Sequence, residues 1–229
     1  MIDMWWKIII FFGMSTVIVA SFLTASPMKA ANSLGPADVY RIFYFHVPQA
    51  WVASLAFVMS MIYSIRFLKT RNMEYDTKAL TANKLGVMFA IVATVTGSIF
   101  AKMTWGEFWN WSEIREVSIF ILLLIYGGYF ALRSAISDPD TRANLSAVIS
   151  IIFTVAALFL IFVLPRIYSV FSQHPSDSIV DGTGKITMGV TVRMIFFSSL
   201  IMFTALFFWI YNLSVRIARL SKNTLLENK

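Results

Sequence analysis

The sequence predicts an all-α membrane protein whose six helices cross the bilayer. The chain has 229 residues, of which 58% are hydrophobic and only 14% charged, and its mean hydropathy is +0.73. Soluble domains are nearer to about 45–50% apolar and about 25% charged, so a water-soluble fold could not hide this much apolar surface. The apolar residues form continuous runs, whereas the strands of a membrane β-barrel would show short alternating patterns.

Six apolar runs are long enough to span a membrane. Each has roughly 16 to 22 residues, near the ~20 that a helix needs to cross a ~30 Å hydrocarbon core. The predicted spans are 8–25, 47–65, 85–101, 117–132, 145–164 and 194–215. None of them contains Asp, Glu, Lys, Arg or His, which argues against a proton relay, an ion-coupled transporter or a voltage sensor. The runs leave no room for a separate soluble domain, so we expect residues 1–229 to form one membrane domain.

The first span has one competing interpretation. Lys7 precedes it and small residues follow it, as in a cleaved signal peptide. Its apolar run is longer than the usual ~7–15 residues of such a peptide. Trp5 and Trp6 also fit the interfacial belt of a membrane helix, so a retained helix is favoured.

The flanks of the other spans indicate where helices begin and end. Pro36 fits the start of a short interfacial helix, with aromatic residues at i, i+3 and i+4, that leads into His46. Pro48 fits the first turn of the second span, so His46 is expected at or just before that helix N-terminus. The third and fourth spans enclose a tryptophan-rich loop. An aromatic stretch after the fifth span extends that helix until Pro175 ends it, and the sixth span follows.

The basic residues predict the topology. With the N-terminus inside, twelve of the nineteen Lys and Arg residues lie in cytoplasmic segments and seven in outer ones. This excess places both termini in the cytoplasm and loops 26–46, 102–116 and 165–193 outside. The formal charge of +7 therefore reports topology rather than a nucleic-acid partner.

The residue types available for chemistry are few. The absence of cysteine excludes disulfides, thiolate metal sites, iron–sulfur clusters and cysteine catalysis. Both histidines, His46 and His174, fall in outer loops. Alone, each is explained as a helix-capping or a solvated histidine. As a pair without a carboxylate cluster, they fit the two axial positions of a haem iron better than a closed zinc site.

The third loop carries three tryptophans within seven residues: Trp105, Trp109 and Trp111. An aromatic belt at the headgroups explains a scatter of such residues, but this density favours a planar apolar ligand. A helix would put Trp105 and Trp109 on one face, and an extended segment would align all three. Arg115, Arg41 and Lys102 are the candidate partners for carboxylates of the ligand. No nucleophile–base pair or carboxylate dyad stands out, so we predict no enzyme activity.

Two motifs resemble a known family. The run from Trp105 to Trp111 (WGEFWNW) resembles the tryptophan-rich outer loop, WGxxWxWD, of the haem-handling proteins of cytochrome c biogenesis. HVPQAW, beginning at His46, resembles the first outer-histidine motif of the CcmC branch of that family. The pattern departs at Ser112, where the family has Asp, and Arg115 lies one residue further along than usual.

The resemblance implies a multi-pass protein of the bacterial inner membrane. It implies that haem b is bound at the outer face by His46 and His174 against the tryptophan loop; Arg115 is a candidate from the residues alone, because its shifted position leaves no family role to carry over. The implied partners are the haem chaperone CcmE, the ATP-binding-cassette components CcmA and CcmB and the small membrane protein CcmD. A permease subunit for a small solute, a purely structural subunit and a haem-handling protein of another cytochrome c biogenesis system remain alternatives.

Overall fold

The computed structural model describes residues 2–23, 37–169, 172–174 and 188–227. Within these ranges the chain is helical and contains no strand, and six helices are long and apolar enough to cross a membrane. The elements are α1 (Ile2–Leu23), η1 (Ala37–Ile42), α2 (Phe43–Thr70), α3 (Met73–Trp105), α4 (Ile114–Ala135), α5 (Pro139–Leu158), η2 (Phe159–Val163), α6 (Leu164–Ile167) and α7 (Val190–Glu227). The predicted all-α fold with six spanning helices is confirmed, and its sidedness stays a prediction.

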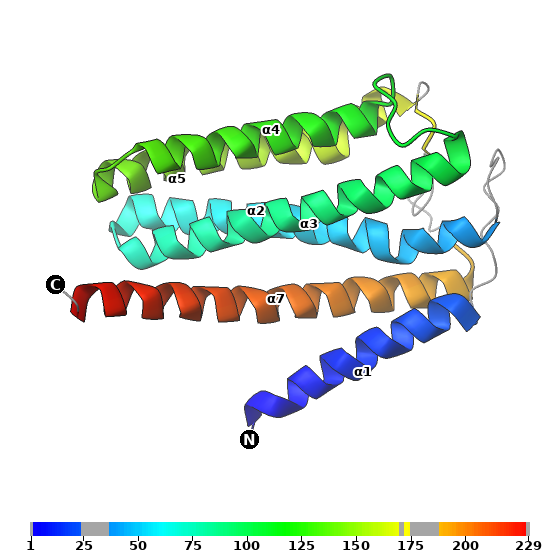
Figure 1. Ribbon diagram of the computed structural model, residues 1–229, viewed down its shortest axis with the longest axis horizontal. Helices are drawn as coiled ribbons and strands as arrows, with labels where there is room; N and C mark the ends of the chain where they lie inside the picture. Colours follow the sequence, from blue (N-terminus) through cyan, green and yellow to red (C-terminus); the bar gives the residue numbers. More distant parts are fainter. Residues whose placement is uncertain (1, 24–36, 170–171, 175–187, 228–229) are drawn as a thin grey trace.

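The helices form a layered bundle around α2 and α3 (Figure 1). These two pack against each other along their length, α5 and α7 both contact α2, and α4 packs on α5. α1 contacts α7 and diverges from it towards the N-terminus. The start of α2, the end of α3 and the start of α4 lie at one end of the bundle, together with the end of α5 and the start of α7. The chain termini lie towards the other end, so the candidate residues of separate loops share one end.

Short capped connections make the antiparallel pairs. α2 ends at Arg71, which adopts a left-handed conformation with φ of 56° and whose N–H donates to the Phe67 carbonyl at 2.7 Å. The Asn72 side chain then caps α3 by accepting a hydrogen bond from the Glu74 N–H at 2.9 Å. Asp138 caps α5 in the same way through the Thr141 N–H at 2.8 Å. Each cap lets the next helix begin within a few residues.

The observed helices are longer than the predicted spans. α3 begins at Met73 rather than near residue 85, and α2 begins at Phe43, directly after η1. The predicted short helix leading to His46 is therefore present from Ala37, but the expected start of the next helix was wrong: His46 lies inside α2, and Pro48 is further along it. Hydropathy marks only the apolar part of a helix, and polar residues continue its hydrogen-bonded ladder beyond it. The predicted loop segments 26–36 and 175–187 lie outside the described residues.

Apolar side chains cover the outside of the bundle, and several polar ones lie inside. Ile201 is 60% exposed and Val155 61%, as expected for surfaces that face lipid. Ser150 and Asn83 are fully buried, and the Asn83 amide donates to the Ser150 hydroxyl at 3.1 Å. Ser60 also lies 2.9 Å from the Ser150 hydroxyl. Such hydrogen bonds join helices where lipid offers no competing partner.

A buried ion pair joins α3 to α4. Both guanidinium nitrogens of Arg133 donate to the Asp76 carboxylate, at 2.8 and 2.6 Å, and the two side chains are only 12% and 11% exposed. The bidentate geometry fixes both orientation and distance. The pair therefore holds the α3–α4 contact at the end of the bundle opposite the candidate residues.

Removing one partner of this pair is expected to destabilise the fold. Asp76→Asn leaves the Arg133 charge buried without a carboxylate, which costs about 3 kcal/mol of unfolding free energy. Glu74→Gln is the control, because Glu74 is 44% exposed and pairs with Lys78 and Arg219 near the surface, where solvent screens the charges and the loss of a pair has little effect on stability. Equilibrium unfolding in detergent measures both variants. Equal stability of the two would contradict a stabilising role for the buried pair.

The end of the fifth spanning segment contains a π-helical turn. α5 passes into η2, in which the Leu164 N–H bonds back to the Phe159 carbonyl, and α6 follows. Pro165 has no N–H to donate, so the helical ladder is interrupted there. The Arg166 side chain donates to the Phe162 carbonyl. This turn brings the chain towards residues 172–174.

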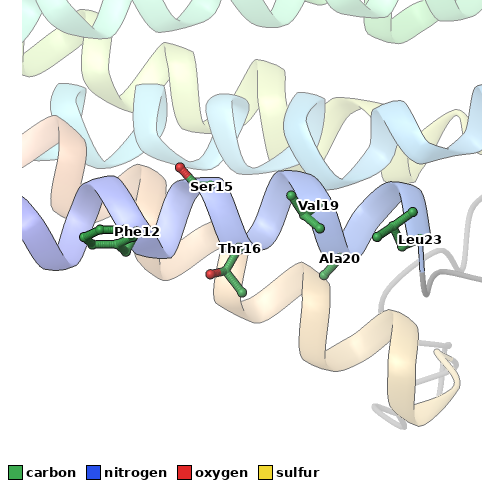
Figure 2. A pocket seen from close by; sticks show the side chains of 6 residues that line it. All are labelled: Phe12, Ser15, Thr16, Val19, Ala20 and Leu23. Atoms are coloured by element: carbon green, nitrogen blue, oxygen red, sulfur yellow. The ribbon is translucent and has the colours of Figure 1, made fainter.

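A surface pocket lies on α1 (Figure 2). Its lining side chains are Phe12, Ser15, Thr16, Val19, Ala20 and Leu23, all from that helix. The Ser15 hydroxyl already donates to the Phe11 carbonyl at 2.9 Å. The pocket contains none of the candidate site residues, and its lining is mostly apolar, as expected for a surface of a spanning helix that faces lipid.

Candidate functional site

His46 is held against α3 in one tautomer. Its Nδ1 lies 2.9 Å from the Ala93 carbonyl oxygen and 3.1 Å from the Thr96 hydroxyl. The Thr96 hydroxyl itself lies within hydrogen-bond reach of two α3 carbonyls, those of Val92 and Ala93. A carbonyl can only accept, so Nδ1 carries the proton and Nε2 keeps its lone pair. Nε2 forms no hydrogen bond within the described part of the chain. This is the arrangement of a histidine ready to bind a metal.

Gly97 makes room for the His46 ring. A Cβ atom at this position would lie 2.9 Å from Cε1 of His46, closer than real Cβ contacts allow. Sequence reasoning missed this residue, because nothing in the local sequence of a spanning helix shows which glycine faces a histidine 51 positions away. The glycine belongs to the site as the surface on which the ring rests.

His174 faces a buried carboxylate. Its Nδ1 lies 3.4 Å from Oε1 of Glu113, whose side chain is fully buried. Glu113 also accepts hydrogen bonds from the Ser172 hydroxyl at 2.7 Å and from the Gln173 N–H at 2.6 Å. Sequence reasoning did not select Glu113 as a site residue. The signal was its place just before the apolar run of α4, where a carboxylate caps the helix and accepts from the Arg115 N–H at 3.3 Å.

The protonation states of this pair follow from burial and hydrogen bonding. Burial would raise the pKa of the Glu113 carboxyl, but the His174 ring and the bonds from Ser172 and Gln173 outweigh it and hold that pKa at about 2. Burial lowers the pKa of the His174 imidazole, the Arg115 charge lowers it further, and Glu113 opposes both. Near neutral pH, Glu113 is therefore ionised and His174 is mostly neutral, which is the metal-binding form of imidazole.

One face of α3 connects the two histidines. Ala93, Gly97, Ala101 and Trp105 are spaced four residues apart and follow one row along the helix. His46 lies against the first two, and the His174 ring packs edge-on against Trp105 with ring centroids 4.8 Å apart. Gly97 and Trp105 are separated by about 12 Å along the helix axis.

The three tryptophans of the third loop do not share one surface. α3 ends at Trp105, where Gly106 adopts a left-handed φ of 89°. Trp109 and Trp111 contact each other, with centroids 5.7 Å apart, and both contact Phe120. Neither the helical nor the extended arrangement expected from the sequence describes the loop. Trp111 is 64% exposed, whereas the buried indole nitrogen of Trp109 has no hydrogen-bond partner among the described residues.

The three candidate cations differ in whether a group of the protein already pairs with them. Arg41 pairs with Asp38 at 3.0 Å, and the Lys102 amine donates to the Gly106 carbonyl at 2.8 Å. Arg115 has no carboxylate within ion-pair distance in the described ranges, and its buried Nε has no hydrogen-bond partner there. Arg115 is thus the cation that is best placed for an anionic group of a ligand.

The structure shows the surroundings of Ser112, which stands where the tryptophan-rich motif has Asp. Ser112 is exposed, and its N–H donates to the Asn110 side chain at 2.9 Å. The neighbouring Glu113 provides the buried carboxylate instead. Its oxygens, rather than a group at position 112, hold the chain that carries His174.

Fold and site together define a polytopic α-helical membrane protein with two imidazoles, an aromatic loop and, among the described residues, an arginine without an ion-pair partner at one end of its bundle. The family model described as Heme exporter protein C matches residues 2–227, and the chain belongs to this family.

Curated relatives agree with the family match. A protein named Heme exporter protein C from Paracoccus denitrificans is 32% identical over 143 residues, covering 62% of this chain and 56% of the relative. The protein of the same name from Rhodobacter capsulatus is 35% identical, covering 52% and 48%. A putative cytochrome c biosynthesis ccmC-like mitochondrial protein from Marchantia polymorpha is 35% identical, covering 51% and 53%. The matches span about half the length of these relatives. With the six helices, the bacterial relatives indicate a multi-pass inner-membrane protein.

Proposed function

We propose that this protein handles haem in cytochrome c maturation, binding it at the periplasmic face between His46 and His174. The observation that carries the proposal is the state of the two rings. The Nδ1 of His46 is hydrogen-bonded to the Ala93 carbonyl, and the Nδ1 of His174 lies 3.4 Å from the Glu113 carboxylate, the acceptor nearest to it. This leaves both Nε2 atoms for the axial positions of one iron.

The surrounding residues fit the rest of a haem. Trp105 packs on His174, and the cluster of Trp109, Trp111 and Phe120 offers apolar surface for a porphyrin. Arg115, with its unpartnered buried Nε, suits a propionate. The chain has no cysteine for a thioether link, and the haem proposed here is haem b. In this proposal the bundle is one membrane domain that hands haem to CcmE and works with CcmA, CcmB and CcmD.

The absorbance spectrum of the purified protein, produced with an adequate haem supply, tests this function. A six-coordinate bis-histidine haem spectrum is the expected result. Protein that folds but takes up no haem would overturn the proposal and favour the permease or structural alternatives. Transfer to purified CcmE is then followed by the appearance of haem on that partner.

The proposed sidedness has a separate test. The chain contains no cysteine, so single cysteines introduced at exposed positions report topology without a background. A cysteine at exposed Glu107 should react with a membrane-impermeant thiol reagent in intact spheroplasts, and one at exposed Arg71 should not. The reverse pattern would place the histidines on the cytoplasmic side.

Neutralising Arg115 is expected to weaken haem binding. Arg115→Met removes a charge-assisted hydrogen bond to a propionate, a loss of about 1.5–3 kcal/mol, or roughly 10- to 100-fold in affinity. Lys102→Met makes the same charge change at the same end of the bundle, on an amine already bonded to Gly106. Haem titration of the apoprotein compares the two variants. Equal weakening by both would indicate a general electrostatic effect and no specific propionate contact.

A further inference from the structure

Glu113 stands out among the carboxylates of the third loop. Its side chain is fully buried, while Glu107 in the same loop is exposed. Glu116, the other buried carboxylate here, accepts from the Asn110 N–H at 2.5 Å and so serves the loop itself. Glu113 alone of the three faces a histidine. A buried carboxylate is costly to desolvate, so the groups that it bonds indicate its role in the structure.

The partners of Glu113 come from the segment that carries His174. The Ser172 hydroxyl at 2.7 Å, the Gln173 N–H at 2.6 Å and the His174 Nδ1 at 3.4 Å all converge on its two oxygens. These three residues are consecutive, and Glu113 lies about 60 positions earlier in the chain, at the start of α4. The carboxylate therefore fixes residues 172–174 to the start of α4 by contacts between these two parts of the chain.

The same contacts set the chemical state of the ring. The buried Nδ1 of His174 makes no aligned hydrogen bond to any described residue, and the Glu113 carboxylate is the acceptor it approaches. An ionised carboxylate only accepts, so the proton belongs on Nδ1 and the lone pair on Nε2. A short movement of either group, as on ligand binding, would complete the bond.

We propose that Glu113 is a positioning residue for haem: through its contact with Nδ1 it fixes the orientation and tautomer of His174 and makes Nε2 a better ligand. The inference rests on the proposed function, since it names a residue that acts through one of the proposed axial histidines. Carboxylates that accept from the distal nitrogen of a metal-binding histidine orient that ring and increase its basicity, and their loss lowers metal affinity about 10–100-fold.

Glu113→Gln is the direct variant, because it keeps the volume and one accepting oxygen while removing the charge. Glu107→Gln is the matched control, with the same chemical change at an exposed position of the same loop. In the apoprotein, nitrogen NMR of the two ¹⁵N-labelled histidines should show one tautomer for His174 in the wild type and in the control, and a mixture in Glu113→Gln. Haem titration should show an affinity about 10–100-fold lower for Glu113→Gln only. The reduction potential of its bound haem should shift to a more positive value.

The outcomes separate this inference from the proposed function. If the wild type binds no haem, the proposed function fails, and the tautomer measurement still tests the contact with Glu113. If the wild type binds haem and Glu113→Gln matches the control in tautomer, affinity and potential, Glu113 has no positioning role. Should Glu113→Gln fail to fold, Glu113→Asp keeps the charge but withdraws it from Nδ1. That variant is expected to bind haem more weakly than the control, and equal binding would overturn the proposal.

Discussion

Replacing His46 by alanine is expected to remove the bis-histidine spectrum of bound haem and to weaken haem binding by at least ~100-fold. This exceeds the effect of losing a residue that only orients a metal ligand. His174→Ala is expected to have the same effect, because each ring supplies one axial bond. The purified variants are compared with the wild type by absorbance and by haem titration. Free imidazole should restore part of the six-coordinate spectrum in each alanine variant by occupying the vacated position.

Thr96→Val is the control for His46. It removes a hydroxyl 3.1 Å from Nδ1 but leaves the Ala93 carbonyl, at 2.9 Å, to hold the proton. We therefore expect Thr96→Val to keep the bis-histidine spectrum. A full spectrum in either histidine variant would show that the iron has a different axial ligand.

Adding a single methyl group at Gly97 is expected to displace His46 without disrupting the bundle. The new Cβ of Gly97→Ala would lie 2.9 Å from the ring carbon Cε1, so the ring has to move and its hydrogen bond to Ala93 is weakened. Misplacing an axial ligand in this way should lower haem affinity about 10–100-fold, an effect similar in size to losing the group that orients it. Haem titration and the Soret band position of the bound protein measure the change.

Gly128→Ala on α4 is the matched control for this substitution. An added Cβ there meets nothing within 4 Å, so the variant should bind haem like the wild type. Its helix should gain up to about 1 kcal/mol from the higher helix propensity of alanine. If Gly97→Ala also bound haem like the wild type, the position of the His46 ring against α3 would not matter for haem binding, and the proposed ligand geometry would be wrong.

The sequence was a sound guide to the helices because hydropathy in a membrane protein is a direct physical signal. Six runs without a charged residue predicted six spanning helices, and the structure has them. The helix ends were less accurate: α2 begins at Phe43, and polar residues extend α3 back to Met73. Hydropathy does not predict where these two helices begin, because helix ends depend on caps such as Asn72 and on backbone conformations such as that of Arg71.

The contacts among the candidate residues were predicted only in part, and their role in binding haem stays a prediction. His46, His174 and Trp105 come together along one face of α3, whereas Trp109 and Trp111 form a cluster with Phe120. The residues that hold the histidines could not be found from the sequence. The match between Gly97 and His46 depends on the rotation of two packed helices, and the contact of Glu113 with His174 depends on how two distant loops meet. Local sequence does not encode either relation.

The π-helical turn η2 (Phe159–Val163) has a consequence for how this protein tolerates insertions and deletions. A π-helical turn amounts to one extra residue within an α-helix, and in an α-helix each residue advances the chain by about 100° around the axis. Deleting one residue within η2 would turn it into ordinary α-helix and leave α6 on nearly the same side of the helix, whereas deleting one residue from the regular part of α5 would rotate α6 by about 100°. The spanning part before it would keep its packing. The angular register of the helix thus decides at which positions this segment can lose a residue.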